Sequence, residues 1–320
     1  MATAYHRDQP GAPTYAFGTS GAAGFAAFKT IAKACLVTGY AGLAAAGWEL
    51  VAEATNYLVL RTGNHSGYVC FTWPPSANYM TVYLAETYEG ISSNVMIGQG
   101  LKSGIASANS AQQRVYLAQA VYASTTSSWV LVADEKSFVL NMVGYANSSA
   151  LTVDTYSLIL YAGEDSAGGL ISIGGVNSPS DTNPIPYFDG GNGFTSLRNP
   201  ATGLLVDSGS LLGVRTPGLD TLNRSTASSA ISLLPEISLC PAYWSTSGTV
   251  SGRLRGIALS PLLLKTWDNH AARSLGAAAD LTARTMNTSL DLGGGNSYFI
   301  TVKANNSSFF LMTDAERFWS

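Results

Sequence analysis

The chain has 320 residues, of which 46% are hydrophobic and only 12% are charged. An average soluble domain has roughly 25% charged residues, so hydroxyls, amides and glycine must make up much of this surface. The formal net charge of −3 gives no field that would attract a nucleic acid, and the sequence has no local cluster of Lys and Arg. We therefore expect no nucleic-acid partner, and a surface suited to packed assemblies or to secreted and virion proteins.

Residues 1–21 contain Pro10 and Pro13 among small residues and have no hydrophobic periodicity. This composition predicts an extended N-terminal arm. We expect the arm to lie on a neighbouring subunit, as such segments often do in assemblies.

A short helix is predicted directly after the arm, and Gly39 is a plausible end for it. Apolar residues recur there at spacings of three and four, which places them on one side of a helix: Phe25, Phe28, Ile31, Ala32 and Cys35. Lys29 and Lys33 fall off this stripe. Because the apolar segment is short and contains two lysines, we expect no membrane span.

From Trp48 onward the sequence changes to short segments rich in Val, Tyr, Thr, Phe and Trp, separated by Gly, Ser, Asn and Pro. Such segments are typical of antiparallel strands. We expect a mainly β fold, a sandwich or stack of antiparallel sheets built from repeated hairpins, with one short N-terminal helix and long loops. The predicted division is a β-rich domain with a leading helix (22–162), a loop-rich insertion (163–235) and a C-terminal β-rich part (236–320) that packs with 22–162.

Three segments repeat one hairpin pattern: “WELVAEATNYL”, “WVLVADEKSFV” and “ITVKANNSSFF”. In each, an apolar arm ends at an alanine (52, 133 or 304), four polar residues follow, and then an aromatic residue (Tyr57, Phe138 or Phe309). Trp48 and Trp129 begin the first two arms. Residues on both sides of these strands are apolar, which predicts hairpins buried in the interior.

Asp134 and Glu135 are the most obvious candidates for chemistry, because two adjacent acids lie between apolar runs. A pair of carboxylates works as acid and base only where both face one cleft in different environments. Adjacent residues at a turn point apart, and the third hairpin has “NNSS” at the same place. We interpret the pair as a solvated turn rather than a catalytic dyad.

The other reactive residue types form no recognised constellation. His6, His65 and His270 are isolated, and the “DNH” that ends at His270 has no nucleophile motif to accompany it. The three cysteines, at positions 35, 70 and 240, have apolar neighbours and are expected to be buried thiols. The sequence therefore predicts no catalytic residue, no metal site and no cofactor.

One loop offers aromatic rings and amides of the kind that contact sugars or a receptor. Its candidate contact residues lie in “PIPYFDGGNGF”: Tyr187, Phe188, Asp189, Asn192 and Phe194. The alternative interpretation is that such rings fill strand cores or subunit contacts. The same loop resembles a calcium loop in its oxygen-rich residues but has no terminal Glu.

Four segments resemble, in order, landmarks of virion proteins from tailed bacteriophages. They are “KACLVTGYAGLAAAGWELV” (33–51), “SWVLVADEKSFVLNM” (128–142), “GRLRGIALSPLLL” (252–264) and “SYFITVKANNSSFFLMTDAERFWS” (297–320). The family pattern reads “ACLVxGYG…AAGW”, “WxLVADExxFYL” and “RGxLxG”, followed by an end close to a Trp. This chain departs from it with “SFVLN” in place of a second aromatic and with “AG” in place of “YGS”, and residues 163–235 match poorly.

The resemblance implies a structural component of the particle, of the tail tip or baseplate, and it brings no catalytic residues. We therefore expect a non-enzymatic virion protein whose partners are copies of itself and other phage structural proteins. A host-receptor or glycan-binding adhesin, such as a tail fibre or capsid decoration protein, is the alternative. A glycan-degrading enzyme would need two acids from separate strands at one groove.

Overall fold

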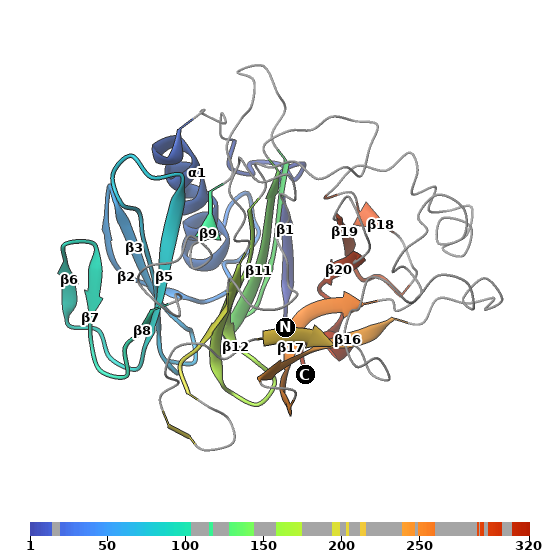
Figure 1. Ribbon diagram of the computed structural model, residues 1–320. Helices are drawn as coiled ribbons and strands as arrows, with labels where there is room; N and C mark the ends of the chain where they lie inside the picture. Colours follow the sequence, from blue (N-terminus) through green and yellow to red (C-terminus); the bar gives the residue numbers. More distant parts are fainter. Residues whose placement is uncertain are drawn as a thin grey trace, which may run out of the picture.

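The protein is described by a computed structural model, in which an N-terminal helix and three sheets form consecutive layers (Figure 1). The described residues are 1–14, 20–103, 115–117, 128–143, 158–174, 194–198, 203–204, 212–215, 239–246, 249–259, 287, 289–290, 294–302 and 309–320. Every pairing between their strands is antiparallel, as the strand registers show. The predicted fold class, mainly β with one short N-terminal helix, is confirmed.

The central sheet has six strands in the order β1-β10-β11-β12-β13-β14. Their bounds are β1 Thr3–His6, β10 Ser128–Ala133, β11 Ser137–Val143, β12 Leu158–Glu164, β13 Leu170–Gly174 and β14 Phe194–Ser196.

An outer sheet, β2-β3-β4-β5-β8 with β9 also paired to β5, lies on one side of the central sheet. Its bounds are β2 Glu49–Ala54, β3 Tyr57–Arg61, β4 Tyr68–Thr72, β5 Tyr79–Ala85, β8 Lys102–Ser103 and β9 Val115–Tyr116. A separate two-stranded hairpin consists of β6 Gly90–Ser92 and β7 Val95–Ile97.

The C-terminal sheet, in the order β15-β16-β17-β20-β19-β18, lies on the opposite side of the central sheet. Its bounds are β15 Leu212–Arg215, β16 Cys240–Thr246, β17 Thr249–Leu259, β18 Ser289–Leu290, β19 Tyr298–Val302 and β20 Phe309–Thr313. A 3-10 turn, η7 (Glu316–Phe318), follows β20.

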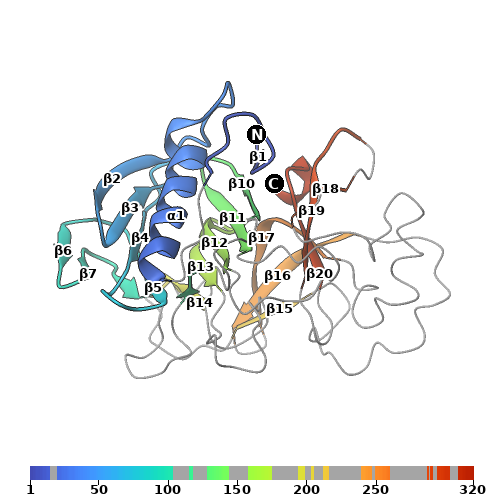
Figure 2. The same cartoon turned by 90° about the horizontal axis from the view of Figure 1, so that it is seen from above.

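The helix α1 (Gly21–Lys33) fills the space between the outer and central sheets (Figure 2). The hydroxyl of Ser20 accepts a hydrogen bond from the Ala23 backbone and so caps its first turn. A π-helical turn, η1 (Ala34–Thr38), continues it as far as Gly39, whose φ of 72° is a left-handed conformation that favours glycine. The predicted stripe is buried, and Gly39 ends the helical segment as expected.

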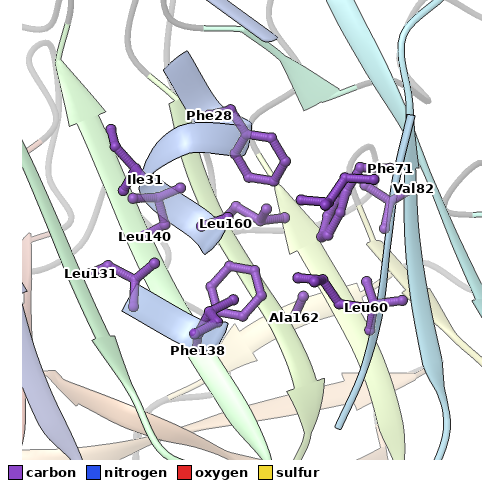
Figure 3. Close-up of a cluster of buried hydrophobic side chains, with 14 of the residues drawn as sticks. Phe28, Ile31, Leu60, Phe71, Val82, Leu131, Phe138, Leu140, Leu160 and Ala162 are labelled. Atoms are coloured by element: carbon purple, nitrogen blue, oxygen red, sulfur yellow. The ribbon is translucent and has the colours of Figure 1, made fainter. Parts of the chain in front are cut away.

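Both faces of the central sheet are buried, each against a different layer. Trp129, Leu131 and Ala133 of β10 face α1 and the outer sheet, whereas Val130 and Val132 face the C-terminal sheet. Figure 3 shows the first of these cores, in which side chains from the three elements interdigitate: Phe28, Ile31, Leu60, Phe71, Val82, Leu131, Phe138, Leu140, Leu160 and Ala162. The interior position predicted for the β10–β11 hairpin is confirmed.

The first hairpin differs from that prediction because β2 is an edge strand with β3 as its partner in the outer sheet. Leu50 and Val51 of β2 are 42% and 37% exposed. An edge strand has a neighbour on one side only, so its residues are less covered than those of a central strand. The expectation that all three hairpins are interior is therefore wrong for β2.

All three repeats are antiparallel hairpins, but their registers differ. In β10–β11, Ala133 pairs with Phe138, as the pattern predicts. In β2–β3, Ala54 pairs with Tyr57 and Ala52 with Val59, and a bulge between Leu50 and Ala52 shifts Leu50 to face Leu60. In β19–β20, Phe309 pairs with Val302, and residue 304 lies outside the described residues. The sequence pattern identifies the hairpins, and turn length and the bulge set the register.

The N-terminal segment is extended at β1, but it lies on its own chain rather than on a neighbour. β1 pairs along its length with β10 of the central sheet. The side chain of Tyr5 is fully buried, and its hydroxyl donates to the Ala44 carbonyl at 2.7 Å. The buried side chain of Tyr5 anchors this segment to its own chain. The expectation of an arm on a neighbouring subunit is therefore wrong for residues 3–6.

The expected boundary at residue 163 cuts through a continuous piece of the central sheet. β12 ends at Glu164, and β13 pairs back onto it from Leu170. β14 then extends the same sheet. The predicted loop-rich insertion therefore does not begin at residue 163, and residues 175–193 lie outside the described part of the chain.

In the part of the chain that the structure describes, we find no helix of the length and apolarity that a bilayer span requires.

Candidate functional site: a buried polar cluster where three sheets meet

Asp134, in the turn between β10 and β11, is buried, which corrects the interpretation of a solvated turn for this residue, whereas Glu135 beside it is half-buried. Asp134 is 5% exposed. Its Oδ1 accepts hydrogen bonds from the backbone of Lys136 at 2.9 Å and of Ser137 at 3.0 Å. Asp134 thus holds the turn in place, because its short side chain satisfies two backbone donors that the hairpin leaves unpaired.

Arg255 of β17 forms a two-pronged ion pair with Asp134 across the two layers. Its Nη2 bonds Oδ2 of Asp134, and its Nη1 lies 3.3 Å from both Oδ1 of Asp134 and Oγ of Ser137. Arg255 is 7% exposed, so both charges are removed from water. Such a pair persists only where the geometry and the remaining hydrogen bonds compensate for desolvation.

The last residues of the chain supply one of those remaining partners. Nε of Arg255 donates to the carbonyl of Trp319 at 2.8 Å, and the guanidinium lies 5.5 Å from the centre of the Trp319 ring. The indole of Trp319 in turn donates to the carbonyl of Thr313 at 2.7 Å. The C-terminal turn η7 therefore encloses the ion pair with hydrogen bonds and with an aromatic face.

Asp165, in the turn between β12 and β13, forms a second buried contact with the C-terminal sheet. Its Oδ2 accepts from Nε1 of Trp244 at 2.7 Å, and its Oδ1 accepts from the backbone of Gly169 at 2.7 Å and of Ala167 at 3.0 Å. Burial raises the pKa of the Asp165 carboxyl, although these three donors act in the opposite direction. The carboxyl is engaged on both oxygens.

The outer sheet joins the same cluster through the loop between β3 and β4. Asn64 donates from Nδ2 to Oε1 of Glu164 at 2.6 Å. The backbone of Gly63 donates to the carbonyl of Glu135 at 2.7 Å. Three sheets therefore meet at the two hairpin turns that begin at Asp134 and Asp165, and we call this region the three-sheet joint.

Two glycines of β17 leave the space that the joint requires. A Cβ at Gly252 would lie 1.8 Å from Oδ2 of Asp165, which is far inside contact distance. Gly256 has a φ of 73°, and its Cβ would lie 2.3 Å from the Trp319 ring. Both positions admit only glycine, because the backbone of β17 runs directly against the side chains that it positions.

The side chains of the joint are arranged to hold the sheets together rather than to react with a substrate. Each oxygen of Asp134 and Asp165 accepts at least one hydrogen bond. Tyr161, also buried, donates to the carbonyl of Glu164 and accepts from the backbone of Arg255. Burial raises the pKa of the Tyr161 hydroxyl far above its usual value. Groups held in this way lower the free energy of the fold by completing one network.

The candidate loop contacts lie mostly outside the described residues: Tyr187, Phe188, Asp189 and Asn192. Phe194 is described as backbone only; it opens β14 and pairs with Ile173. Of the predicted hairpin residues, Trp48 and Trp129 are buried and Tyr57 is half-buried.

The remaining reactive residue types stay apart. His65 pairs with Glu49 at 2.9 Å on the surface, His6 packs on the ring of Phe299, and position 270 lies outside the described residues. Cys35 and Cys70 are buried and free, as predicted. Within the described ranges, no three residues of the metal-binding types lie close enough together to hold an ion.

Sequence reasoning missed the partners of the joint, although their residues stand in four segments that the sequence analysis singled out: 33–51, 128–142, 252–264 and 297–320. Trp48, whose indole donates to the backbone carbonyl of Asp134, comes from the first segment. Asp134 comes from the second, Arg255 from the third and Trp319 from the fourth. The signal that could have found the pairing is Arg255, which stands between Leu254 and Ile257 in the apolar part of β17, since a charge there needs a buried partner.

No family model matches the chain, and the search of curated proteins found no similar sequence.

Proposed function

We propose that the chain is a non-enzymatic structural protein of a tailed bacteriophage particle, located in the virion as a component of the tail tip or baseplate. The observation that carries the proposal is the convergence of the four resembling segments on the three-sheet joint. Segments that lie far apart in sequence and share one buried network are those that related proteins would need in order to form the same fold. The resemblance then concerns residues that stabilise the fold rather than residues of an active site.

The joint also favours a structural over a catalytic role. An acid or base needs a position from which it can reach a substrate. Asp134, the acid that an enzyme hypothesis would use first, is buried under Arg255 and occupied by the turn backbone. The low charge of the chain suits burial of its surface against neighbouring proteins.

The test is to locate the chain in particles. Virions purified from the strain that encodes it would be separated on a density gradient and labelled with an antibody raised against the recombinant protein. We expect the chain to sediment with intact particles and the label to mark one end of the tail. Recovery of the chain only in the soluble fraction, with a known capsid protein in the particle fraction as control, would overturn the proposal.

The adhesin alternative depends on residues 187–194, most of which lie outside the described residues. It stays a prediction, and binding of the purified chain to host cells or to isolated lipopolysaccharide would test it.

A further inference from the structure

The outer sheet has a second face, turned away from α1, that is only partly covered. Its small apolar cluster has four buried members: Val59, Cys70, Ala85 and Met96. Seven half-buried residues pack against them: Ala52, Tyr57, Tyr68, Tyr83, Tyr88, Ile91 and Leu101. We call these eleven residues the tyrosine face.

The hairpin β6–β7 is the cover of this face, and it is apolar on both of its sides. Met96 points inward and is fully buried, while its neighbours Val95 and Ile97 are each 44% exposed. The tip is a tight turn through Ser93 and Asn94, both with positive φ, and Asn94 bonds the side chain of Asn56. The hairpin projects at the far edge of the molecule, next to β2 (Figure 1).

Within the described residues, nothing accounts for an apolar pair on the outside of this hairpin, since Met96 already supplies the packing beneath it. Exposed apolar residues that gather beside a half-covered aromatic cluster are typical of a protein interface.

The tyrosines have the arrangement that interfaces use. Their rings are half-buried, and burial raises the pKa of the Tyr83 and Tyr88 hydroxyls. In the described part of the chain, the hydroxyls of Tyr57, Tyr68 and Tyr88 make no hydrogen bond. A tyrosine with a fixed ring and an unused hydroxyl can give an interface contact area and a hydrogen bond. The cost in conformational entropy is low because the ring is already held in place.

At one end of this face, Glu49 pairs with both Arg61 and His65. Glu49 and Arg61 are cross-strand neighbours on the same side as Tyr68. They form an ion pair of 3.6 Å, and the guanidinium of Arg61 lies 5.5 Å from the Tyr68 ring. Glu53, the other acid of β2, lies on the opposite side and pairs with Lys29 and Lys33 of α1.

We propose that the tyrosine face, with Val95 and Ile97, is the surface through which a second copy of this chain binds, in a two-fold symmetric contact. A face that holds an acid beside basic side chains is complementary to itself, because a two-fold axis can bring Glu49 of each copy to Arg61 of the other. The aliphatic residues of the hairpin favour a protein over a glycan, which would need polar groups in their place. The inference rests on the proposed function only in expecting copies of the chain to meet.

Sedimentation equilibrium of the full chain over a range of concentrations tests the contact. We expect the average mass to rise toward twice that of one chain. The double variant V95K/I97K should weaken the association by at least about tenfold, because it puts two charges into the centre of the interface. Both residues are exposed in the monomer, so near-UV circular dichroism should not change.

The matched control is A26K/T30K, which adds the same charge at two exposed positions of α1. It should dimerise like the wild type. Hydrogen exchange of residues 88–97 should slow as the concentration of the wild type rises, and should not do so in V95K/I97K.

A wild type that remains monomeric up to its solubility limit would overturn the proposal, and so would a dimer that V95K/I97K leaves intact. Binding of a host glycan that V95K/I97K abolishes in a monomeric protein would assign the face to another partner. None of these outcomes bears on whether the chain is found in virions, so the two proposals can fail separately.

Discussion

The indole nitrogen of Trp48 donates a hydrogen bond of 2.8 Å to the backbone carbonyl of Asp134, 86 residues further along the chain. The ring of Trp48 also meets that of Phe138 edge to face, with the ring centres 5.5 Å apart. The residue that leads into the first hairpin thus holds the turn of the second. The two hairpins that have similar sequences are therefore also in direct contact.

Replacement of Trp48 by Phe should lower the free energy of unfolding by about 1–3 kcal/mol, because the buried carbonyl of Asp134 loses its donor and the smaller ring leaves space. Urea denaturation followed by fluorescence measures the change. Trp73→Phe is the control, since the Trp73 indole bonds the carbonyl of Ala77 within its own loop. Equal losses of unfolding free energy in the two variants would show that the contact between the hairpins contributes no more than a hydrogen bond within one loop.

Replacement of Arg255 by Met should be among the most damaging single changes, at about 3–5 kcal/mol, because Asp134 would remain buried without a countercharge. The double variant D134N/R255M should be more stable than R255M, since Asn keeps an acceptor for the turn and carries no charge. A double-mutant cycle from chemical denaturation measures this coupling. Additive losses would contradict a buried ion pair.

The space at Gly256 can be tested against a second glycine of the same conformation. Gly256 and Gly295 have φ values of 73° and 75°, but a Cβ at Gly295 would meet nothing within 4 Å. We expect Gly295→Ala to cost about 1 kcal/mol of backbone strain. Gly256→Ala should cost at least about 2 kcal/mol more, because Trp319 must move. Thermal unfolding of both variants gives the difference, and equal losses would show that Trp319 yields freely.

Glu53 should make stability depend on acidity. Its hydrogen bond with Lys33, and less strongly that with Lys29, hold the pKa of the carboxyl below its usual value of 4.5 despite partial burial. A lowered pKa of an acid contributes stability above the ordinary pKa, and this contribution is lost as the pH falls through the folded-state pKa.

Glu53→Gln should therefore cost about 0.5–1 kcal/mol near pH 7 and nothing at pH 2 to 3. Unfolding experiments across this range, repeated in high salt, measure the effect, which salt should reduce. Glu89→Gln, at an exposed position, is the control and should show no such trend. A loss from Glu53→Gln that persists in acid would mean that packing rather than charge is responsible.

Tyr5→Ala should destabilise the protein by about 3–5 kcal/mol, as truncation of a fully buried aromatic does. Tyr5→Phe should cost only about 1 kcal/mol, the value of the hydrogen bond to Ala44. Deletion of Met1, which is fully exposed, should have no effect. If instead Tyr5→Ala were as stable as the wild type, β1 would be the separable arm that its composition suggests.

The sequence predicted those parts of the fold that depend on local pattern. The 3.6-residue spacing of Phe25, Phe28 and Ile31 identified the buried face of α1. The two-residue alternation in β10 identified the two faces of the central sheet, because both sets of apolar side chains are buried. Those patterns are set by neighbours within one element, and so they can be read from one segment.

Features that depend on distant segments could not be predicted in the same way. Asp134 stands at a turn, where acids are usually exposed, and only Arg255 of another sheet explains its burial. Residues 3–6 look like linker because a four-residue strand has too few positions to show a period, yet β10 offers them an open edge. The bulge in β2, which sets which residues face Leu50 and Glu49, likewise leaves no mark on composition.

The burial of both faces of the central sheet has a consequence for the order in which the protein can be made. The residues that cover one face, through α1 and the outer sheet, are all synthesised before β10, whereas those that cover the other come from β16, β17, β19 and β20. On the ribosome, Val130, Val132 and Val139 therefore remain open to water until the last quarter of the chain emerges. During that interval an exposed apolar sheet is a target for aggregation and for chaperones. A chain cut short by a premature stop should be cleared from the cell rather than accumulate as a smaller folded protein.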